Sequence, residues 1–143
     1  MTQILEGSWT GSLIYSKDYR LHAGKTLYFE MDLMHSGNEF IGKAKDTGGT
    51  GMSPDPADIL GTFSENKIRF LKQYATSHYY MPDGSTEIDR TQKGPVIVYT
   101  GVFDPVSQEF SGDWIIKTRY LLFFIIPLVN KSRGTWTMKR KEN

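Results

Sequence analysis

The sequence predicts an all-β fold: a single antiparallel up-and-down β-barrel of about eight strands. Apolar and polar residues alternate with a period of two in segment after segment, whereas no stretch of about 11–18 residues shows the period of about 3.6 residues that an amphipathic helix requires. Clusters of Gly, Pro, Asn and Asp separate these segments at hairpin spacing. The chain has 143 residues and no shift in composition that marks a boundary, so one domain over 1–143 is expected.

The first half of the chain contains the clearest strand pattern. In the segment 26–35, the alternate positions on one face are all apolar: Leu27, Phe29, Met31 and Leu33. The turn signal Ser36-Gly37-Asn38 follows this segment, and the next two apolar segments show the same alternation. The expected strands of this half are 8–15, 26–35, 39–46 and 58–64.

The second half repeats the alternation with equally short turns. The expected strands are 66–75, 96–104, 108–117 and 132–140. One apolar face and one polar face in each strand are typical of an antiparallel sheet that covers a single core. Closing that sheet into a barrel removes its exposed edges. The remaining segments are expected to be long connections: 47–57, 76–95 and 118–131.

Glycine recurs inside the predicted strands, two residues after an aromatic or aliphatic residue. The pattern occurs at Gly42, Gly61, Gly101 and Gly112. Because glycine weakens a strand, its repetition indicates a sharp bend, a bulge, or room for a large neighbouring side chain. We expect a structural role in which these glycines let the barrel wall curve and make room for the tryptophans Trp9, Trp114 and Trp136.

Composition excludes several classes of function. The net charge is +1, from 17 Lys and Arg against 16 Asp and Glu, so nucleic acid is not an expected partner. The chain has no cysteine and its three histidines, at positions 22, 35 and 78, are widely separated, so neither a metal nor another cofactor is expected. The N-terminal residues lack the basic and apolar regions of a secretory signal, and the longest apolar run is too short for a spanning helix, so a soluble, cytoplasmic protein is expected.

Several short motifs resemble those of calycin-type barrels. The opening Gly7-Ser8-Trp9 is similar to the Gly-x-Trp start of the lipocalin and avidin families. The order of the later motifs resembles that of small, uncharacterised calycin-like barrel proteins: Phe40-Ile41-Gly42, Asp46, Ile59-Leu60-Gly61-Thr62-Phe63, Phe70-Leu71-Lys72-Gln73-Tyr74, Gly112-Asp113-Trp114 and Gly134-Thr135-Trp136-Thr137-Met138. The resemblance implies an up-and-down barrel and a small apolar ligand, without a known reaction. The second and third lipocalin motifs and the avidin ligand contacts are missing, so biotin binding is not expected.

Lys72 is the strongest candidate for a site residue. It shares a face with Phe70 and Tyr74, which predicts a buried position, and a buried ammonium must be paired or hydrogen-bonded. Three residues at inward positions could partner it: His35, Asp46 and Tyr99. Such a cluster in the barrel mouth would orient the carboxylate or carbonyl of a ligand. The alternatives are a strand-end lysine that reaches water and a purely structural Lys–Asp pair.

We therefore expect a non-catalytic carrier or sensor that binds a small hydrophobic molecule in the barrel lumen. The expected ligand-binding residues are Trp9, Phe29, Met31, His35, Asp46, Phe70, Lys72, Tyr74, Tyr99, Phe103 and Trp114. One alternative is a small-barrel enzyme of the isomerase or cyclase type, for which no catalytic residue is identified. The other alternative is an interaction module that acts through the apolar segment 119–129.

The C-terminal fifth of the chain combines basic charge with an apolar run. Residues 115–143 contain seven of the 17 basic residues and one of the 16 acidic residues. The basic residues lie on both sides of the apolar run Tyr120–Val129. This composition is typical of a membrane-surface segment whose apolar residues enter the lipid while basic residues meet anionic headgroups. The run could instead form a homodimer interface. It could also be a long strand with a buried lid that plugs the barrel.

Overall fold

The computed structural model describes residues 5–17, 23–80, 86–89, 91, 93–121 and 127–142. For residues 77–80, 86–89, 117–121 and 127–132 it describes the backbone alone. No helix in these parts of the chain has the length and apolar character needed to cross a bilayer.

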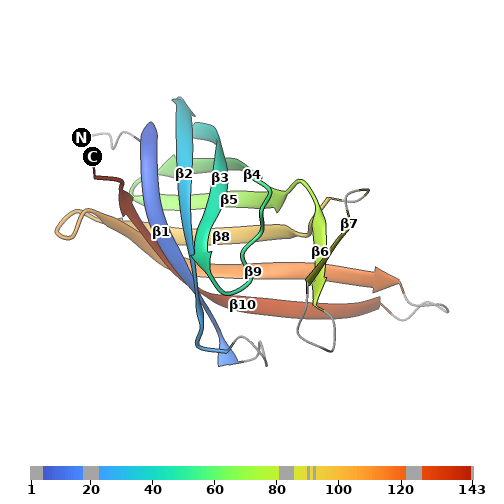
Figure 1. Ribbon diagram of the computed structural model, residues 1–143. Helices are drawn as coiled ribbons and strands as arrows, with labels where there is room; N and C mark the ends of the chain where they lie inside the picture. The colour runs from blue at the N-terminus through green and yellow to red at the C-terminus, as the bar shows by residue number, and fades with distance from the viewer. Residues whose placement is uncertain are drawn as a thin grey trace.

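Eight antiparallel strands close into a barrel in the order β1-β10-β9-β8-β5-β4-β3-β2 (Figure 1). The barrel strands are β1 (Gly7–Tyr15), β2 (Thr26–Ser36), β3 (Glu39–Gly49), β4 (Ala57–Ser64), β5 (Lys67–Tyr74), β8 (Val96–Asp104), β9 (Glu109–Leu121) and β10 (Pro127–Arg140). Between β5 and β8 the chain adds a separate two-stranded sheet, made of β6 (Ser77–Tyr80) and β7 (Thr86–Asp89). Apart from this insertion, strands adjacent in sequence are adjacent in the barrel, which confirms the predicted fold class.

The two ends of the barrel differ in their connections. At one end, which we call the hairpin end, short turns join β2 to β3, β4 to β5 and β8 to β9. The turn between β4 and β5 has two residues, Glu65 and Asn66, and both have positive φ, as a tight hairpin with twisted strands requires. At the opposite end, which we call the loop end, the connections that follow β1, β3, β5 and β9 are longer.

The strands β9 and β10 are longer than the sequence predicts. Their pairing continues from Lys117 opposite Lys131 to Leu121 opposite Pro127, so the prediction of a connection over 118–131 was wrong for the ends of that range. The extension lies beyond the last pairs with β8 and β1, where no barrel core imposes an alternation of apolar and polar residues. The two strands β6 and β7 were likewise missed, inside the predicted connection 76–95.

Aromatic rings fill the hairpin-end half of the barrel. Phe110 lies 5.4 Å from Trp9, 5.5 Å from Phe63 and 4.9 Å from Phe103, measured between ring centroids. Near the middle of the barrel, where this half meets the other, Phe70 stacks on Tyr99 at 4.5 Å, and Trp136 meets both rings edge-on. The centre of this half is therefore a packed core rather than a lumen.

Glycines in the wall provide the space for these rings, as the sequence predicts. A Cβ atom at Gly101 would lie 2.8 Å from Cζ2 of Trp136, and one at Gly134 would lie 2.6 Å from Nε1 of Trp114. Both separations are shorter than ordinary van der Waals contact between heavy atoms. The glycines are thus required by the close approach of large side chains from neighbouring strands.

Candidate ligand-binding site

The loop-end half of the barrel contains a cavity of about 100 Å³. Its apolar lining comes from four strands: Leu13, Leu27, Ile97, Trp114 and Ile116. Tyr15 and Tyr74 also line it. Drug-sized ligands occupy pockets of about 300–1,000 Å³, whereas a cavity of about 150 Å³ holds benzene. The cavity is smaller than one that holds benzene but is partly open, so it suits a short chain or one ring that projects through the opening.

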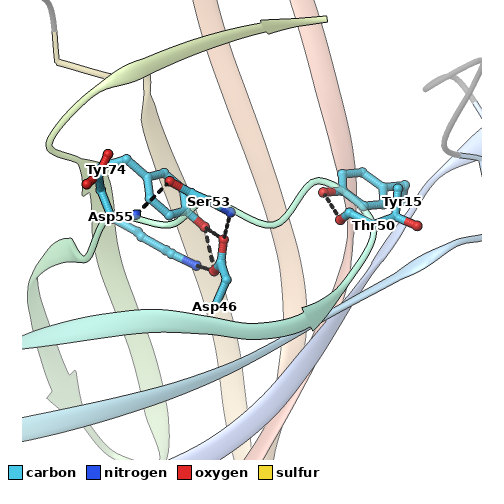
Figure 2. A network of polar contacts seen from close by, with 7 residues as sticks. Tyr15, Asp46, Thr50, Ser53, Asp55 and Tyr74 are labelled. Carbon is cyan, nitrogen blue, oxygen red and sulfur yellow. Dashed lines mark hydrogen bonds and ion pairs between the residues drawn. The ribbon is translucent and has the colours of Figure 1, made fainter. Parts of the chain in front are cut away.

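A buried ion pair lies beside this cavity. Lys72 and the side chain of Asp46 are both inaccessible to solvent, and Nζ of Lys72 lies 3.7 Å from Oδ1 of Asp46. Asp46 also accepts hydrogen bonds from the hydroxyl of Tyr74, at 2.8 Å, and from the backbone N–H of Ser53, at 2.8 Å (Figure 2). The carboxylate is therefore well satisfied by donors from β5 and from the connection between β3 and β4.

That connection is held against the site at several points. The hydroxyl of Tyr15 donates to the carbonyl of Thr50, and the hydroxyl of Thr76 donates to the carboxylate of Asp55. Figure 2 shows Tyr15 and Thr50 at one end of the connection and Asp46, Ser53 and Tyr74 at the other. These bonds position Ser53, and hence Asp46, relative to the strands that line the cavity.

Three aromatic rings surround the ammonium of Lys72. Its Nζ lies 5.0 Å from the ring centroid of Phe29, 5.0 Å from that of Tyr74 and 5.8 Å from that of Tyr99. Cation–π attraction of this kind offsets part of the cost of removing the charge from water. Burial still lowers the pKa of Lys72 below its ordinary value, although the charge of Asp46 acts in the opposite direction.

Burial and negative charge act together on the two tyrosines. Burial raises the pKa of Tyr99 well above the ordinary tyrosine value, and the charge of Asp46 raises it further. The pKa of Tyr74 is raised for the same two reasons. Both phenols are therefore neutral hydrogen-bond donors at neutral pH.

Two donors of this cluster lack an acceptor. Neither Nζ of Lys72 nor the hydroxyl of Tyr99 has a hydrogen-bond partner among the described residues, although both atoms are buried. On their strands they stand one inward position deeper than the cavity-lining residues Tyr74 and Ile97. A buried donor without an acceptor costs about 1–3 kcal/mol, and folded proteins contain few of them. Neither Lys72 nor Tyr99 lines the cavity itself, so the two donors are buried polar groups next to it.

The structure brings together only part of the predicted set of site residues. Asp46, Lys72, Tyr74, Tyr99 and Phe29 form the cluster below the cavity. Trp114 lines the cavity, and Phe70 packs under the cluster against Tyr99.

The other predicted residues lie elsewhere in the barrel. Trp9 and Phe103 belong to the packed hairpin-end core, and Met31, the cross-strand partner of Trp9, is buried away from the cavity lining. His35 is half-buried opposite Phe40 at the hairpin end. It is six residues along β2 from Phe29, about 20 Å for an extended strand, and so does not partner Lys72. Alternation predicts the face that a residue occupies but not its depth in the barrel.

The sequence analysis missed several residues that line the cavity. Leu13, Leu27, Ile97 and Ile116 are ordinary aliphatic residues at inward positions, and nothing in their type distinguishes them from core. Their position could have done so, because each lies near the end of its strand that adjoins a long connection.

The structure does not fully describe two of the histidines and one apolar segment. His22 lies outside the described residues, as do residues 122–126 of the run Tyr120–Val129, and only the backbone of His78 is described. In the described part of the chain, no group of three or more His, Asp or Glu residues could hold a metal ion.

Comparison with known proteins gives no relative: no family model, curated protein or solved structure matches the chain significantly. The closed eight-stranded barrel is consistent with the calycin-like fold that the sequence motifs resemble. Membership of that family stays a prediction.

Proposed function

We propose that the protein binds a small, largely apolar molecule that carries one neutral hydrogen-bond acceptor. The observation that supports this proposal is an apolar cavity with two buried, unpaired donors below its floor: Nζ of Lys72 and the hydroxyl of Tyr99, each one inward position deeper than the lining residues Tyr74 and Ile97. The apolar part of the ligand would pack against the aliphatic lining and Trp114. Its acceptor would reach the floor and take the hydrogen bonds that the two donors do not make within the protein.

The charges of the site favour a neutral acceptor over an anionic one. Lys72 is already paired with Asp46, and Tyr74 and Tyr99 are neutral, so the cluster carries no net charge. A carboxylate would add an unbalanced negative charge beside buried side chains, which is costly. A ketone, aldehyde, ester or amide carbonyl would accept the same hydrogen bonds without that cost. The preferred class is therefore a carbonyl compound with a ring or a short apolar chain.

The proposal can be tested with three six-membered-ring probes that differ in one group: cyclohexanone, cyclohexanecarboxylate and methylcyclohexane. We expect cyclohexanone to bind with the highest affinity, because each hydrogen bond gained adds about 0.5–1.5 kcal/mol, or up to about tenfold in affinity. Binding would be measured by changes in tryptophan fluorescence and by chemical-shift perturbation. Native mass spectrometry of freshly purified protein, followed by organic extraction, would identify a ligand retained from the cell.

Three variants locate the binding. Tyr99→Phe should reduce the preference for cyclohexanone over methylcyclohexane, because it removes one donor and keeps the ring. Ile97→Trp should block all three probes by filling the cavity. Met138→Leu, a conservative change at a buried position next to Phe110 in the hairpin-end half, is the matched control and should change nothing. Binding that survives Ile97→Trp, or no saturable binding by any probe, would refute the proposal.

A further inference from the structure

Among the lysines whose side chains the structure describes, Lys72 alone is completely buried. Its side chain starts on β5, and its Nζ lies 3.7 Å from Oδ1 of Asp46 on β3 and 5.0 Å from the ring centroid of Phe29 on β2. The side chain therefore passes in front of β4 inside the barrel, because β4 lies between β5 and β3. The fold thus holds a primary amine in the barrel interior, next to the cavity proposed for a carbonyl compound.

Two neighbours of Lys72 line that cavity. Ile97 is its direct cross-strand partner on β8, and Tyr74 is the next inward residue on β5. Directly paired residues have Cβ atoms about 4.5–5.5 Å apart, and Nζ lies 5.0 Å from the ring centroid of Tyr74. A lysine has a long, flexible stem, so changes in its torsion angles bring Nζ from below the cavity floor to the inner end of a ligand.

The surroundings of Nζ favour addition to a carbonyl group. Burial lowers the pKa of Lys72 below its ordinary value, against the opposing effect of the charge of Asp46, and this increases the share of neutral amine. The neutral amine of a desolvated lysine is the nucleophile that forms Schiff bases with carbonyl compounds. The hydroxyl of Tyr99, which has no acceptor among the described residues, would donate to the carbonyl oxygen and polarise the carbonyl group.

We propose that Lys72 captures short aliphatic aldehydes as a Schiff base, a step that rests on the proposed binding of a carbonyl compound in the cavity. Aldehydes are favoured over ketones because the carbonyl carbon carries a hydrogen in place of a second chain, which suits a cavity of about 100 Å³.

The reaction balances with the groups already present. Nζ forms a bond to the carbonyl carbon, and the carbonyl oxygen leaves as water with two of the three protons of the ammonium. Asp46 accepts one of these protons and passes it on to the oxygen. The product is a protonated imine that keeps the positive charge of Lys72, so its ion pair with Asp46 is preserved. Water reverses the reaction and releases the aldehyde.

The test is reductive trapping of the whole chain with butanal and sodium cyanoborohydride at neutral pH. The reductant converts the imine into a stable secondary amine, and peptide mass spectrometry locates the label. We expect Lys72 to be labelled more than about tenfold faster than Lys43, since binding in the cavity brings the aldehyde next to the amine. Lys43 is the matched control because it is also paired with an aspartate, Asp58, but its side chain is 69% exposed. Ile97→Trp should protect Lys72 and leave the labelling of Lys43 unchanged.

Methyl butanoate separates this proposal from the binding proposal. The ester offers the same kind of acceptor on a chain of similar length but forms no imine. We expect chemical-shift perturbation to show that it binds, and we expect it to slow the labelling of Lys72 but not that of Lys43. Ester binding without faster labelling of Lys72, or labelling of Lys72 that the ester does not slow, would overturn the Schiff-base proposal and leave the binding proposal standing. If neither the ester nor butanal binds, both proposals fail.

Discussion

The two halves of this barrel are built from the same eight strands but treat buried polar groups differently. In the hairpin-end half, the indole N–H of Trp9 donates to the carbonyl of Leu5 at 2.8 Å, and that of Trp136 donates to the carbonyls of Thr100 and Asp113, both at 3.1 Å. In the loop-end half, the donors of Lys72 and Tyr99 find no acceptor among the described residues. Satisfied polar atoms indicate a core optimised for stability, whereas unsatisfied donors beside a cavity are typical of a binding site.

The same comparison applies to shape. Large rings and wall glycines fill the hairpin-end half, where the turns are short and the chain closes the barrel tightly. At the loop end, aliphatic side chains, two tyrosines and Trp114 border an open volume of about 100 Å³. The difference teaches that strand pairing alone does not determine whether a small barrel is hollow. The sizes of the inward residues at each depth determine it.

The largest effect is expected from removing the anion of the buried pair. Asp46→Asn should destabilise the protein by about 3–5 kcal/mol, because it leaves the ammonium of Lys72 buried without a counter-charge. Lys72→Met should cost less than Asp46→Asn, since the carboxylate of Asp46 keeps its hydrogen bonds from Tyr74 and Ser53, which compensate part of the charge that is left buried. Urea unfolding followed by tryptophan fluorescence measures both free energies.

The asymmetry between these two variants is the informative quantity. If Lys72→Met destabilises the protein as much as Asp46→Asn, the two charges stabilise the fold as a pair. The loop-end half would then resemble the hairpin-end half in being optimised for stability, and the case for a ligand would weaken. If Lys72→Met is instead neutral or stabilising, the lysine is retained for a reason other than folding.

The fold was more predictable from the sequence than the site. Alternation and turn signals located all eight barrel strands, because burial against a single core imposes a period of two. The inward position of Lys72 followed from the same parity, and Asp46 was among its proposed partners. Depth along the barrel was not predictable, which is why His35 was grouped with Lys72. The extension of β9 and β10 beyond the barrel was left as one of several alternatives, because its strands have no core to alternate against.

A smaller effect is expected from overpacking the hairpin-end half. A Cβ atom at Gly61 would lie 2.5 Å from the carbonyl oxygen of Arg69 and 2.6 Å from Cζ of Phe40. Gly61→Ala should therefore destabilise the barrel by about 1–3 kcal/mol, the usual cost of inserting a methyl group into a packed core. Gly48→Ala is the control, because a Cβ there meets no atom within 4 Å. Thermal unfolding of the two variants would separate them, and equal melting temperatures would contradict tight packing at Gly61.

Alkaline pH should weaken the loop-end half through its tyrosines. In the unfolded chain Tyr99 ionises near pH 10, but in the folded protein its pKa is raised well above that value. Above about pH 10 the unfolded chain therefore binds fewer protons than the folded protein, and the free energy of unfolding falls as pH rises, by up to about 1.4 kcal/mol per pH unit for one tyrosine. The free energy of unfolding of Tyr99→Phe should fall less steeply with pH, as measured by urea unfolding between about pH 9 and pH 11.

Lys72 acts in the opposite direction over part of this range. Its pKa is lowered from 10.5 in the folded protein, so the unfolded chain binds the extra proton and stability rises with pH until the unfolded lysine has also titrated. Lys72 is present in both the original protein and Tyr99→Phe, so its contribution cancels when the two slopes are subtracted. Identical slopes would show that Tyr99 is not buried as a neutral phenol.

The smallest effect is expected from an ion pair of the same chemistry on the outer wall. Lys43 and Asp58 stand directly opposite each other on β3 and β4 and form a salt bridge, but their side chains are 69% and 64% exposed, against 0% for both Lys72 and Asp46. Water screens the exposed pair, so Asp58→Asn should cost at most about 1 kcal/mol and should cost less in high salt. A loss as large as that of Asp46→Asn would mean that cross-strand charge pairing stabilises this barrel wherever it occurs. A small loss would leave burial as the property that separates the two pairs.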